Sequence, residues 1–522
     1  MANALQPRRS AATGLPRVGV LPAHEFGARA RLFDALAASY GVVFERGAFS
    51  GCAATVAFGV EAPPGLPSLC FAPTVERRPG DVALHDVPSL DARLRGHTLG
   101  DGRALGPPLG VEPGDIVLAS CAGAPVWTAR PDRPARRSAV APDELGAEES
   151  LRDQFVDGRF LGLLPLIELL RSLAGASGWT PPPPRACFVL DDPNLHRPRY
   201  GHADFHELAA HARRDGYHVA VATVPADQWF VSDRAAQAFR DTAALSLAVH
   251  GNDHVHGELG RPLATRERKA LVAQALRRIE SLERHSGLRV SRVMVAPHEI
   301  CSDAMAETIL RSDLEALCYG FGVRAAGRPR ADWEPADLRG TGLPVLPRRP
   351  LHSPRGELVL RAYLDQPLIL GCHQLDLANG LEVLAEAAAE IDAIAQPHWM
   401  SLGEIARANV AWRRDGDTLL LRPYARRFSV DVPPGVDTIV VELPSTHGAP
   451  ELELLVAHGQ VGIVSQPLAV TPGESLDLAL RRVGAFDHRT VPPPRRSFWA
   501  VQRRLVTESR DRLSPQIGRA HV

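Results

Sequence analysis

Four short apolar runs in the middle of the chain each end in residues that can bind metal ions or move protons. The runs are ACFVL, LSLAV, VMVA and LILGC, and the residues that follow them are, in order, Asp191 and Asp192, His250 and His254, Pro297, His298 and Glu299, and His373. Aspartate and histidine supply the oxygen and nitrogen ligands that zinc and similar divalent ions accept. A second aspartate beside a metal ligand can act as a general base on water. These residue types therefore indicate metal-assisted hydrolysis.

The spacing of these residues is weaker evidence than their shared location. With 20 histidines in 522 residues, about 0.8 pairs spaced four apart are expected by chance, and two occur, His202/His206 and His250/His254. The first pair lies where a helix is expected to begin, so it is read as solvated or capping. The aspartate pair, which precedes a proline, could be a polar turn, and His373 a hydrogen-bonded core histidine. Two adjacent carboxylates after a buried type of strand are nevertheless hard to explain by packing.

Parallel strands that alternate with helices would bring the four sets together. From Arg185 onward, strand-like runs such as HVAVATVP and PLILGCH alternate with helical stretches such as Phe205–Arg214 and Arg266–His285. Six or so βα repeats over about 200 residues predict a parallel α/β barrel, complete or open. Active-site residues of such barrels lie at the carboxyl ends of the strands. We therefore expect the four sets to converge on one rim.

The sequence on either side of this region predicts further parts. The expected divisions are a small open α/β domain with mostly parallel strands (1–140), a connecting helix and Pro-rich linker (141–184), the barrel (185–404), a β-sandwich-like domain (405–485) and a Pro/Arg-rich tail (486–522). A clear helix is expected at Ala28–Tyr40. The apolar stretch Phe155–Leu173 is expected to be a buried helix rather than a membrane anchor, because it has no basic polar face.

Composition excludes several classes of protein. Lysine and arginine number 59 against 60 aspartates and glutamates, so no global basic field exists to hold nucleic acid or an anionic membrane. The 7 cysteines are scattered and odd in number, which favours reduced thiols over a disulfide framework. No run of 18 apolar residues occurs, and no secretory signal is expected, because no continuous apolar stretch follows the first arginines. The glycines before Arg130 form no nucleotide-binding fingerprint. A cytoplasmic location is the expectation.

The order of the motifs resembles that of the polysaccharide deacetylases of carbohydrate esterase family four, which belong to the glycoside hydrolase/deacetylase barrel superfamily. The motifs are FVLDDP, AVHGNDH, VAPH and LILGCH, and the likeness spans roughly Arg185–Met400. The resemblance implies a barrel of the deacetylase type that holds Zn²⁺ or another divalent transition metal. It also implies roles for five residues: catalytic base for Asp191, metal ligands for Asp192, His250 and His254, and general acid for His373.

The chain departs from the family pattern at two places. Pro193 and Asn194 follow the aspartate pair directly, where the family has Gly-Pro, and Val295 stands where the family has an arginine. His298 or Glu299 is expected to take the orienting role of that arginine. The residues expected to bind substrate are Asn194, Pro297, His298 and Glu299.

The resulting hypothesis is a metal-dependent hydrolase that removes an N- or O-acetyl group from a carbohydrate. One alternative is a glycosidase on the same barrel, for which Glu299 and Asp191 would be the pair of carboxylates. Another is a non-enzymatic sugar-binding or assembly protein that retains only a metal. No nucleic-acid or membrane partner is expected.

Overall fold

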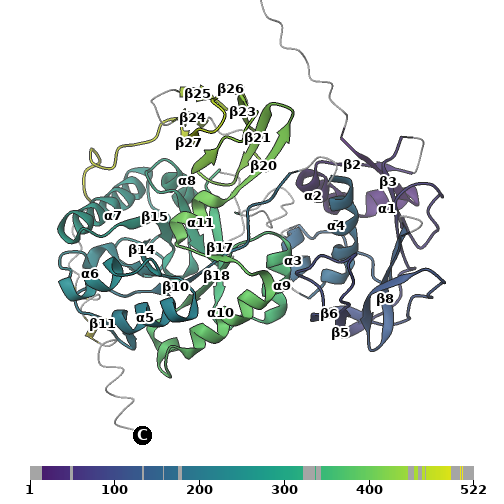
Figure 1. Cartoon of the computed structure of the whole chain (residues 1–522), viewed down its shortest axis with the longest axis horizontal. Coiled ribbons are helices and arrows are strands. Elements are labelled where there is room, and N and C mark those ends of the chain that lie inside the picture. The colour runs from purple at the N-terminus through teal and green to yellow at the C-terminus, as the bar shows by residue number, and fades with distance from the viewer. Residues whose placement is uncertain are drawn as a thin grey trace, which may run out of the picture. The chain divides into compact units, whose positions relative to one another are not determined.

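The structure is a computed structural model. It describes residues 15–47, 51–131, 135–147, 149–156, 158–174, 179–320, 336, 342–444, 452–456, 461–464, 466–494, 502, 506 and 508–509. The chain forms two compact units, one of Met1–Gly178 with Arg328–Ala331 and one of Trp179–Gly327 with Asp332–Val522. Both are drawn in Figure 1. The finer division into five parts stays a prediction.

The first unit is built on one nine-stranded sheet. Its strands, in order across the sheet, are β2 (Val43–Arg46), β1 (Arg17–Leu21), β3 (Ala54–Phe58), β4 (Ser68–Phe71), β9 (Ala135–Ser138), β8 (Ala124–Arg130), β7 (Ile116–Cys121), β5 (Arg78–Leu84) and β6 (Thr98–Leu105). The strands from β2 to β9 pair in parallel, whereas β8, β7, β5 and β6 continue the sheet in antiparallel pairs. A tight turn at Ala122 and Gly123, both with positive φ, joins β7 to β8, and such a turn connects antiparallel strands. The prediction of mostly parallel strands therefore holds for only half of the sheet.

One helix of this unit, α4 (Phe160–Ala174), is strongly buried. Its residues Phe160, Leu161, Leu163, Leu164, Leu166, Ile167, Leu169 and Leu170 are all 0% exposed. The helix contacts β4, β6 and β9, and the other described helices here are α1 (Ala23–Ala28), α2 (Ala30–Tyr40) and α3 (Leu151–Val156). The expected helix at Ala28–Tyr40 and the buried helix are thus confirmed, the second as two pieces. No helix in the described part of the chain is long and apolar enough to cross a membrane.

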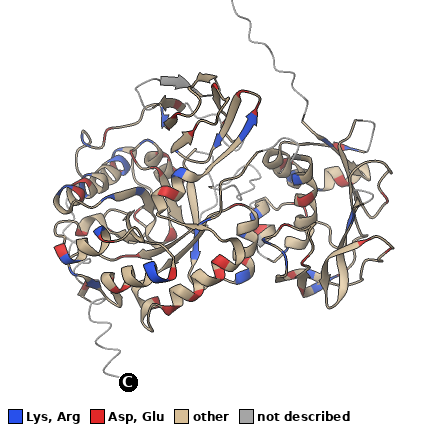
Figure 2. Cartoon of the chain, viewed as in Figure 1, with Lys and Arg blue, Asp and Glu red and all other residues tan. Residues whose placement is uncertain are grey.

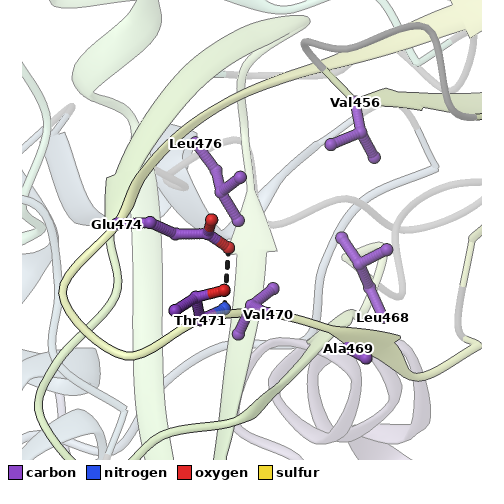
Figure 3. Close-up of a pocket in the computed structure, with 7 residues that line it drawn as sticks. All are labelled: Val456, Leu468, Ala469, Val470, Thr471, Glu474 and Leu476. Atoms are coloured by element: carbon purple, nitrogen blue, oxygen red, sulfur yellow. Dashed lines mark hydrogen bonds between the residues drawn. The ribbon is translucent and has the colours of Figure 1, made fainter.

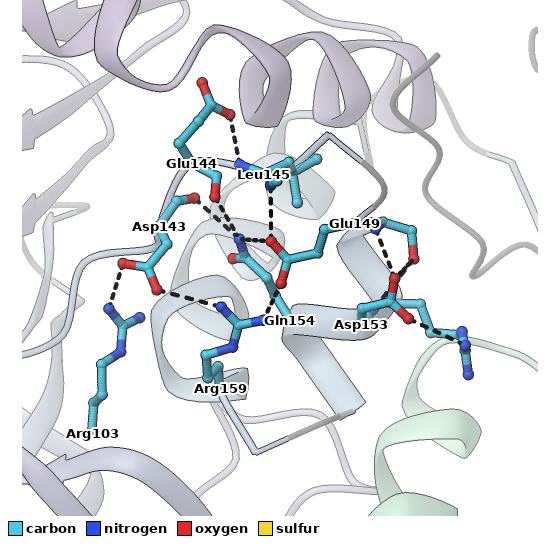
Figure 4. Close-up of polar contacts among 11 residues, drawn as sticks. Arg103, Asp143, Glu144, Leu145, Glu149, Asp153, Gln154 and Arg159 are labelled. Atoms are coloured by element: carbon cyan, nitrogen blue, oxygen red, sulfur yellow. Dashed lines mark hydrogen bonds and ion pairs between the residues drawn. The ribbon is translucent and has the colours of Figure 1, made fainter. Parts of the chain in front are cut away.

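Ion pairs hold the segment that leads from β9 to α4 (Figure 4). The Asp143 carboxylate accepts a hydrogen bond of 2.6 Å from Arg103 of β6 and lies 3.6 Å from Arg159. Arg159 also pairs with Glu149. Each of these side chains is partly exposed, so the network positions the segment more than it adds to stability.

The second unit contains a closed barrel of seven parallel strands. In order around the barrel they are β10 (Arg185–Asp191), β13 (Val219–Thr223), β14 (Leu245–His250), β15 (Val290–Val295), β16 (Ala316–Tyr319), β17 (Val345–Pro350) and β18 (Leu368–Cys372), and β18 pairs again with β10. A short strand, β19 (His398–Trp399), adds to the first residues of β10. The prediction of a parallel βα barrel is confirmed.

Helices connect these strands and surround the barrel (Figure 1). They are α5 (Phe205–Asp215), α6 (Asp233–Arg240), α7 (Thr265–Ser286), α8 (Asp303–Leu310), α9 (Arg355–Tyr363) and α10 (Glu382–Ala395). Local chemistry sets their ends: the Asp204 side chain accepts the first N–H groups of α5, and Gly216, at φ 75°, ends it. Acidic and basic residues are interspersed along α7, whereas α10 carries acidic residues only (Figure 2).

Alternate residues of the strands fill the barrel. The buried cluster inside it comprises Cys187, Val189, Ala220, Ala222, Ala248, Val293, Val295, Ala316, Cys318, Leu346 and Ile369, together with Leu402, Ile405 and Ala406 of α11 (Leu402–Ala408). Because side chains of a strand alternate between its two faces, this cluster identifies which positions point inward. Gly403 of α11 packs on Ser291, the second residue of β15. The helix therefore closes the amino end of the barrel and leaves the carboxyl end as the rim.

Two four-stranded sheets follow the barrel. Their orders are β20 (Val410–Asp415), β21 (Thr418–Pro423), β23 (Thr438–Val441), β26 (Leu468–Ala469), and β22 (Arg427–Asp431), β27 (Ser475–Arg482), β24 (Leu452–Val456), β25 (Val461–Ile463). Side chains of both sheets, such as Leu421 and Leu478, form one buried core. A pocket of about 300 Å³ opens beside β24, β26 and β27, with Val456, Val470 and Leu476 among its walls and Glu474 bonded to the Thr471 N–H (Figure 3).

Candidate metal centre and active site

Four candidate side chains extend the inward-facing series of their strands at or near the carboxyl end. Asp191 continues the inward series Cys187, Val189 of β10, and His250 follows Ala248 of β14 in the same alternation. Arg348 lies two residues after the inward-facing Leu346 of β17. Ile369 of β18 faces inward as well, and steps of two residues from it lead to Gly371 and then to His373, just after the strand. An alternation of period two therefore places four polar residues on the carboxyl rim, above an apolar interior.

Asp192, His250 and His254 form a group, among the residues that the structure describes, that could hold a metal ion. One donor atom from each lies within 4.8 Å of the others. The Asp192 Oδ1 is 3.6 Å from His250 Nε2 and 3.1 Å from His254 Nε2. Donor atoms on a tetrahedral zinc ion, each bonded at about 2.0–2.1 Å, are about 3.4 Å apart. The two measured separations bracket that value, so the group fits Zn²⁺ or a similar ion.

Hydrogen bonds around His250 leave the correct nitrogen for a metal. Its Nδ1 lies 3.1 Å from the carbonyl oxygen of Val295. A carbonyl can only accept, so Nδ1 carries the proton; in the neutral ring, Nε2, which faces Asp192, then has the lone pair that a metal needs. A backbone partner of this kind also fixes the orientation of the ring. The residue is 1% exposed.

A buried carboxylate, Glu258, shapes the loop between His250 and His254. It accepts the N–H groups of Asn252 at 2.6 Å and of Asp253 at 3.1 Å. Burial raises the pKa of Glu258, while these two N–H groups lower it. Gly251, at φ 63°, lies so close to Glu258 and Pro297 that any Cβ there would collide with both. The tight loop between His250 and His254 therefore depends on this glycine and this glutamate.

Asp191 is held by an arginine from a distant strand. Arg348 donates from both terminal nitrogens to the two Asp191 carboxylate oxygens, at 2.8 and 2.7 Å, and from Nε to Glu299 at 2.5 Å. Burial by itself raises the pKa of Asp191, but the charge of Arg348, followed by that of His250, outweighs burial and lowers the pKa below its ordinary value. Gly371 lies beside the guanidinium: a Cβ there would be 3.4 Å from a terminal nitrogen of Arg348, at van der Waals contact.

His373 lies at the open side of the rim. Its Nε2 is 4.0 Å from Asp191 Oδ2, and its side chain is 61% exposed. Asp376, which could have paired with the imidazole, instead accepts the backbone N–H of His373 at 2.7 Å. The ring is therefore accessible to solvent beside Asp191.

The four residues expected to bind substrate have different surroundings. The His298 ring packs at a tilt of 42° against that of His254 and edge-on against that of His256, at centroid distances of 4.8 and 4.7 Å. Glu299 pairs with Arg348 and accepts the N–H of Gly320. Pro297 is buried against Gly251, and Asn194 is 1% exposed and accepts the N–H of His196. Their roles in binding stay predictions.

Backbone strain concentrates at the same place. Seven non-glycine residues among those described have positive φ, and four of them are Asp192 (82°), His254 (53°), His298 (58°) and Glu299 (57°). Such conformations cost of order 1–3 kcal/mol each and cluster at functional sites. Their concentration around the three potential ligands supports a functional reading of the rim.

Sequence reasoning did not find Arg348 and Glu258. The residue that bonds both oxygens of Asp191 is Arg348, which also bonds Glu299; the orienting role expected of His298 or Glu299 stays a prediction. Arg348 could have been found only as an arginine at an inward position of a buried strand. The segment contains Pro347 and Pro350, however, so its sequence is typical of a loop. The other histidine pair is a helix start, as expected, where His206 Nε2 bonds the Arg234 carbonyl.

No protein-family model matches the chain, and no curated protein sequence matches it. Solved structures that it resembles include the carbohydrate esterase family four domain of a multidomain xylanase from the hindgut metagenome of Trinervitermes trinervoides (10% identity, 43% of this chain and 89% of that one, TM-score 0.25). Another is a peptidoglycan deacetylase of Bacillus subtilis (10% identity, 44% of this chain and 92% of that one, TM-score 0.26). A third is a carbohydrate esterase family four pseudoenzyme of Bacillus anthracis (10% identity, 42% of this chain and 64% of that one, TM-score 0.25). At these identities and TM-scores, function has to be argued from the site itself.

Proposed function

We propose that this protein is a metal-dependent hydrolase that removes an acetyl group from a carbohydrate. The observation that carries the proposal is the convergence of Asp192, His250 and His254 on one barrel rim, beside a buried Asp191 and an accessible His373. Three protein ligands leave open positions at a metal, which is typical of catalytic rather than structural sites. The carbohydrate substrate class comes from the motif resemblance and is the part that experiment must test.

The metal is assigned to Asp192 Oδ1 and the Nε2 atoms of His250 and His254. A carboxylate and two imidazoles suit zinc, and also other divalent transition ions. Bound there, the ion supplies Lewis-acid chemistry, which activates water and polarises the acyl carbonyl. Glu258 and the Val295 carbonyl hold the ligands in place from outside, as supporting residues do in metal sites.

Asp191 is assigned the role of general base. Its lowered pKa keeps the carboxylate ionised at neutral pH, which is the form that accepts a proton. Arg348 occupies one lone pair of each oxygen and prevents the carboxylate from rotating, while a second lone pair on each oxygen remains. The base is thus held in one orientation beside the metal ligands.

His373 is assigned the role of general acid. It lies 4.0 Å from Asp191, and its exposure leaves it free to meet the leaving group of a bound substrate. A protonated imidazole in that place can donate a proton to the departing amine or alcohol.

A glycosidase is less well supported. Such an enzyme needs one carboxyl group that stays protonated at neutral pH and a second that stays ionised. Asp191 and Glu299 both pair with the same guanidinium of Arg348. The positive charge lowers the pKa of Asp191, which opposes the role of a protonated acid.

Acetate release tests the proposal. The full chain, loaded with Zn²⁺, is incubated with tetra-N-acetylchitotetraose or acetylated xylotetraose, and free acetate is measured. Asp191→Asn is expected to lose hydrolysis by roughly 10²–10⁴-fold and to retain metal, whereas Asp233→Asn, a change on the exposed start of α6, is the matched control. Release of reducing sugar in place of acetate would point to a glycosidase. If neither acetate nor reducing sugar is released from either substrate, the hydrolase proposal fails and the alternative of a sugar-binding protein is favoured.

A further inference from the structure

Two adjacent aromatic side chains are strongly exposed on the barrel. Trp229 is 76% and Phe230 49% exposed. They lie in the loop after β13, and their ring centroids are 6.1 Å apart with a tilt of 36°. Aromatic residues make up only 6% of the chain, and solvent exposure of such rings side by side usually marks a binding surface.

The position of this loop relates it to the metal centre. In the barrel order β13 lies between β10, which leads to Asp192, and β14, which ends at His250. Backbone hydrogen bonds join the loop to both neighbours: the Ala226 N–H donates to the Asn252 carbonyl at 2.9 Å, and the Ser232 N–H to the Leu195 carbonyl at 2.8 Å. The aromatic pair is therefore attached to both loops that carry the metal ligands.

The loop is held rigidly beneath the rings. Gln228 is buried and donates to the Thr223 hydroxyl at 2.7 Å and the Val224 carbonyl at 3.2 Å. His196, from the loop after Asp192, packs its ring 4.7 Å from that of Trp229 and bonds the Asp227 carbonyl at 2.7 Å. The aromatic pair is thus oriented before any ligand arrives, which reduces the entropy lost on binding.

The size of the patch distinguishes between occupants. A tryptophan and a phenylalanine each bury about 150–250 Å² when fully covered, and their exposed fractions leave about 300 Å² or less available. A stable protein partner needs about 800 Å² on each side. A sugar ring, which has one apolar face of C–H groups and a rim of hydroxyls, is of the right size to stack on one indole.

We propose that Trp229, with Phe230 beside it, is a stacking subsite for a second sugar unit of an oligosaccharide whose acetylated unit lies at the metal centre. The inference rests on the proposed function for the nature of the chain. It deepens that function by assigning a second sugar-binding subsite to named residues of the loop after β13. His196 supports Trp229 from behind and acts as a positioning residue.

Chain-length dependence of binding tests this subsite. Dissociation constants of N-acetylchito-oligosaccharides and acetylated xylo-oligosaccharides with one to six units are measured calorimetrically, with and without Zn²⁺. Wild type is expected to bind tetramers at least tenfold more tightly than monomers in one of the two series. In Trp229→Ala, the ratio of monomer to tetramer dissociation constants is expected to fall about tenfold. In Trp229→Phe, most of that ratio is expected to remain. Trp412→Ala, which removes a 43% exposed tryptophan from β20, is the control and is expected to leave the gain unchanged.

Each other outcome is decisive. Absence of a chain-length gain in wild type for both series, or an undiminished gain in folded Trp229→Ala, would overturn the subsite. Self-association of wild type that Trp229→Ala abolishes would assign the rings to a second copy and would equally overturn it. If the gain depends on Trp229 but no acetate is released, the proposed hydrolysis fails and the sugar subsite stands.

Discussion

Asp191 is the residue around which the polar side chains of the rim are arranged. It directly precedes Asp192, the proposed metal ligand, accepts two hydrogen bonds from Arg348, and lies 4.0 Å from His373. The aspartates and histidines could be predicted because each follows an apolar run that reads as a strand. Arg348 could not, because it lies 157 residues from Asp191 in a proline-containing segment and only the closed barrel brings the two together.

Replacing Arg348 by lysine tests how Asp191 is controlled. Lysine keeps the charge but cannot bond both oxygens of Asp191 and also Glu299 in the planar geometry of arginine. We expect the pKa of Asp191 to rise, so the acid limb of the pH–rate profile should move to higher pH. Because a lowered pKa stabilises the fold only above the ordinary aspartate value of about 3.9, stability at neutral pH should also fall, by about 1–3 kcal/mol.

The neighbouring Arg349 provides the control for that experiment. It lies on the same strand and pairs with Glu357 of α9, away from the rim. Arg349→Lys is expected to leave the acid limb where it is in wild type. An equal shift in both variants, or no shift in Arg348→Lys, would show that Arg348 does not set the pKa of Asp191.

At the scale of elements, the loops after the strands determine the geometry of the site. The helices α5 and α7 begin and end within one residue of the predicted stretches Phe205–Arg214 and Arg266–His285, since their caps and apolar spacing are local signals. The β17 strand was missed because Pro347 and Pro350 are typical of loops. The loop from His250 to His254 was predicted as a ligand pair, but its support by Glu258 depends on tertiary contacts that no local pattern shows.

Glu258→Gln tests the support of this loop. Glutamine retains one acceptor oxygen, so either the Asn252 or the Asp253 N–H loses its partner. We expect metal affinity to fall about 10–100-fold, the usual effect of removing a residue that supports the ligands. The control is Glu267→Gln, which removes a carboxylate that accepts a backbone N–H at the start of α7. Unchanged metal affinity in Glu258→Gln would mean that the loop holds its shape without this carboxylate.

At the scale of the whole molecule, the barrel and the two sheets after it belong to one unit. Arg426 donates to the carbonyls of Ser312 and Leu314 beside β16, and His488 lies 2.9 Å from Asp313. The bridge between Thr180 and Trp412 also joins the start of the unit to β20. Composition alone suggested a boundary near residue 405, because the pattern changes from βα repeats to strands. Changes in pattern do not report how tightly two parts are bonded.

These contacts predict which fragment folds by itself. A fragment of residues 179–494 should be soluble, bind metal and unfold in one cooperative transition, because it keeps the barrel and both sheets. A fragment of residues 179–409 should be less stable or aggregate, since it exposes the surface that β20 and β22 cover. It would also leave the buried Glu315 paired with Arg407 but without its second partner, Arg427 of β22. Calorimetry of both fragments measures this. Equal stability of the two would show that the sheets are independent of the barrel.

The central claim is that Asp192, His250 and His254 meet at one metal ion. The most direct measurement is the metal content of the purified full chain after dialysis against Zn²⁺, determined by mass spectrometry. Wild type is expected to hold about one ion per chain, and the His250→Ala/His254→Ala double variant none, while the His202→Ala/His206→Ala double variant keeps its ion. Loss of the ion from the second double variant with retention in the first would contradict the account.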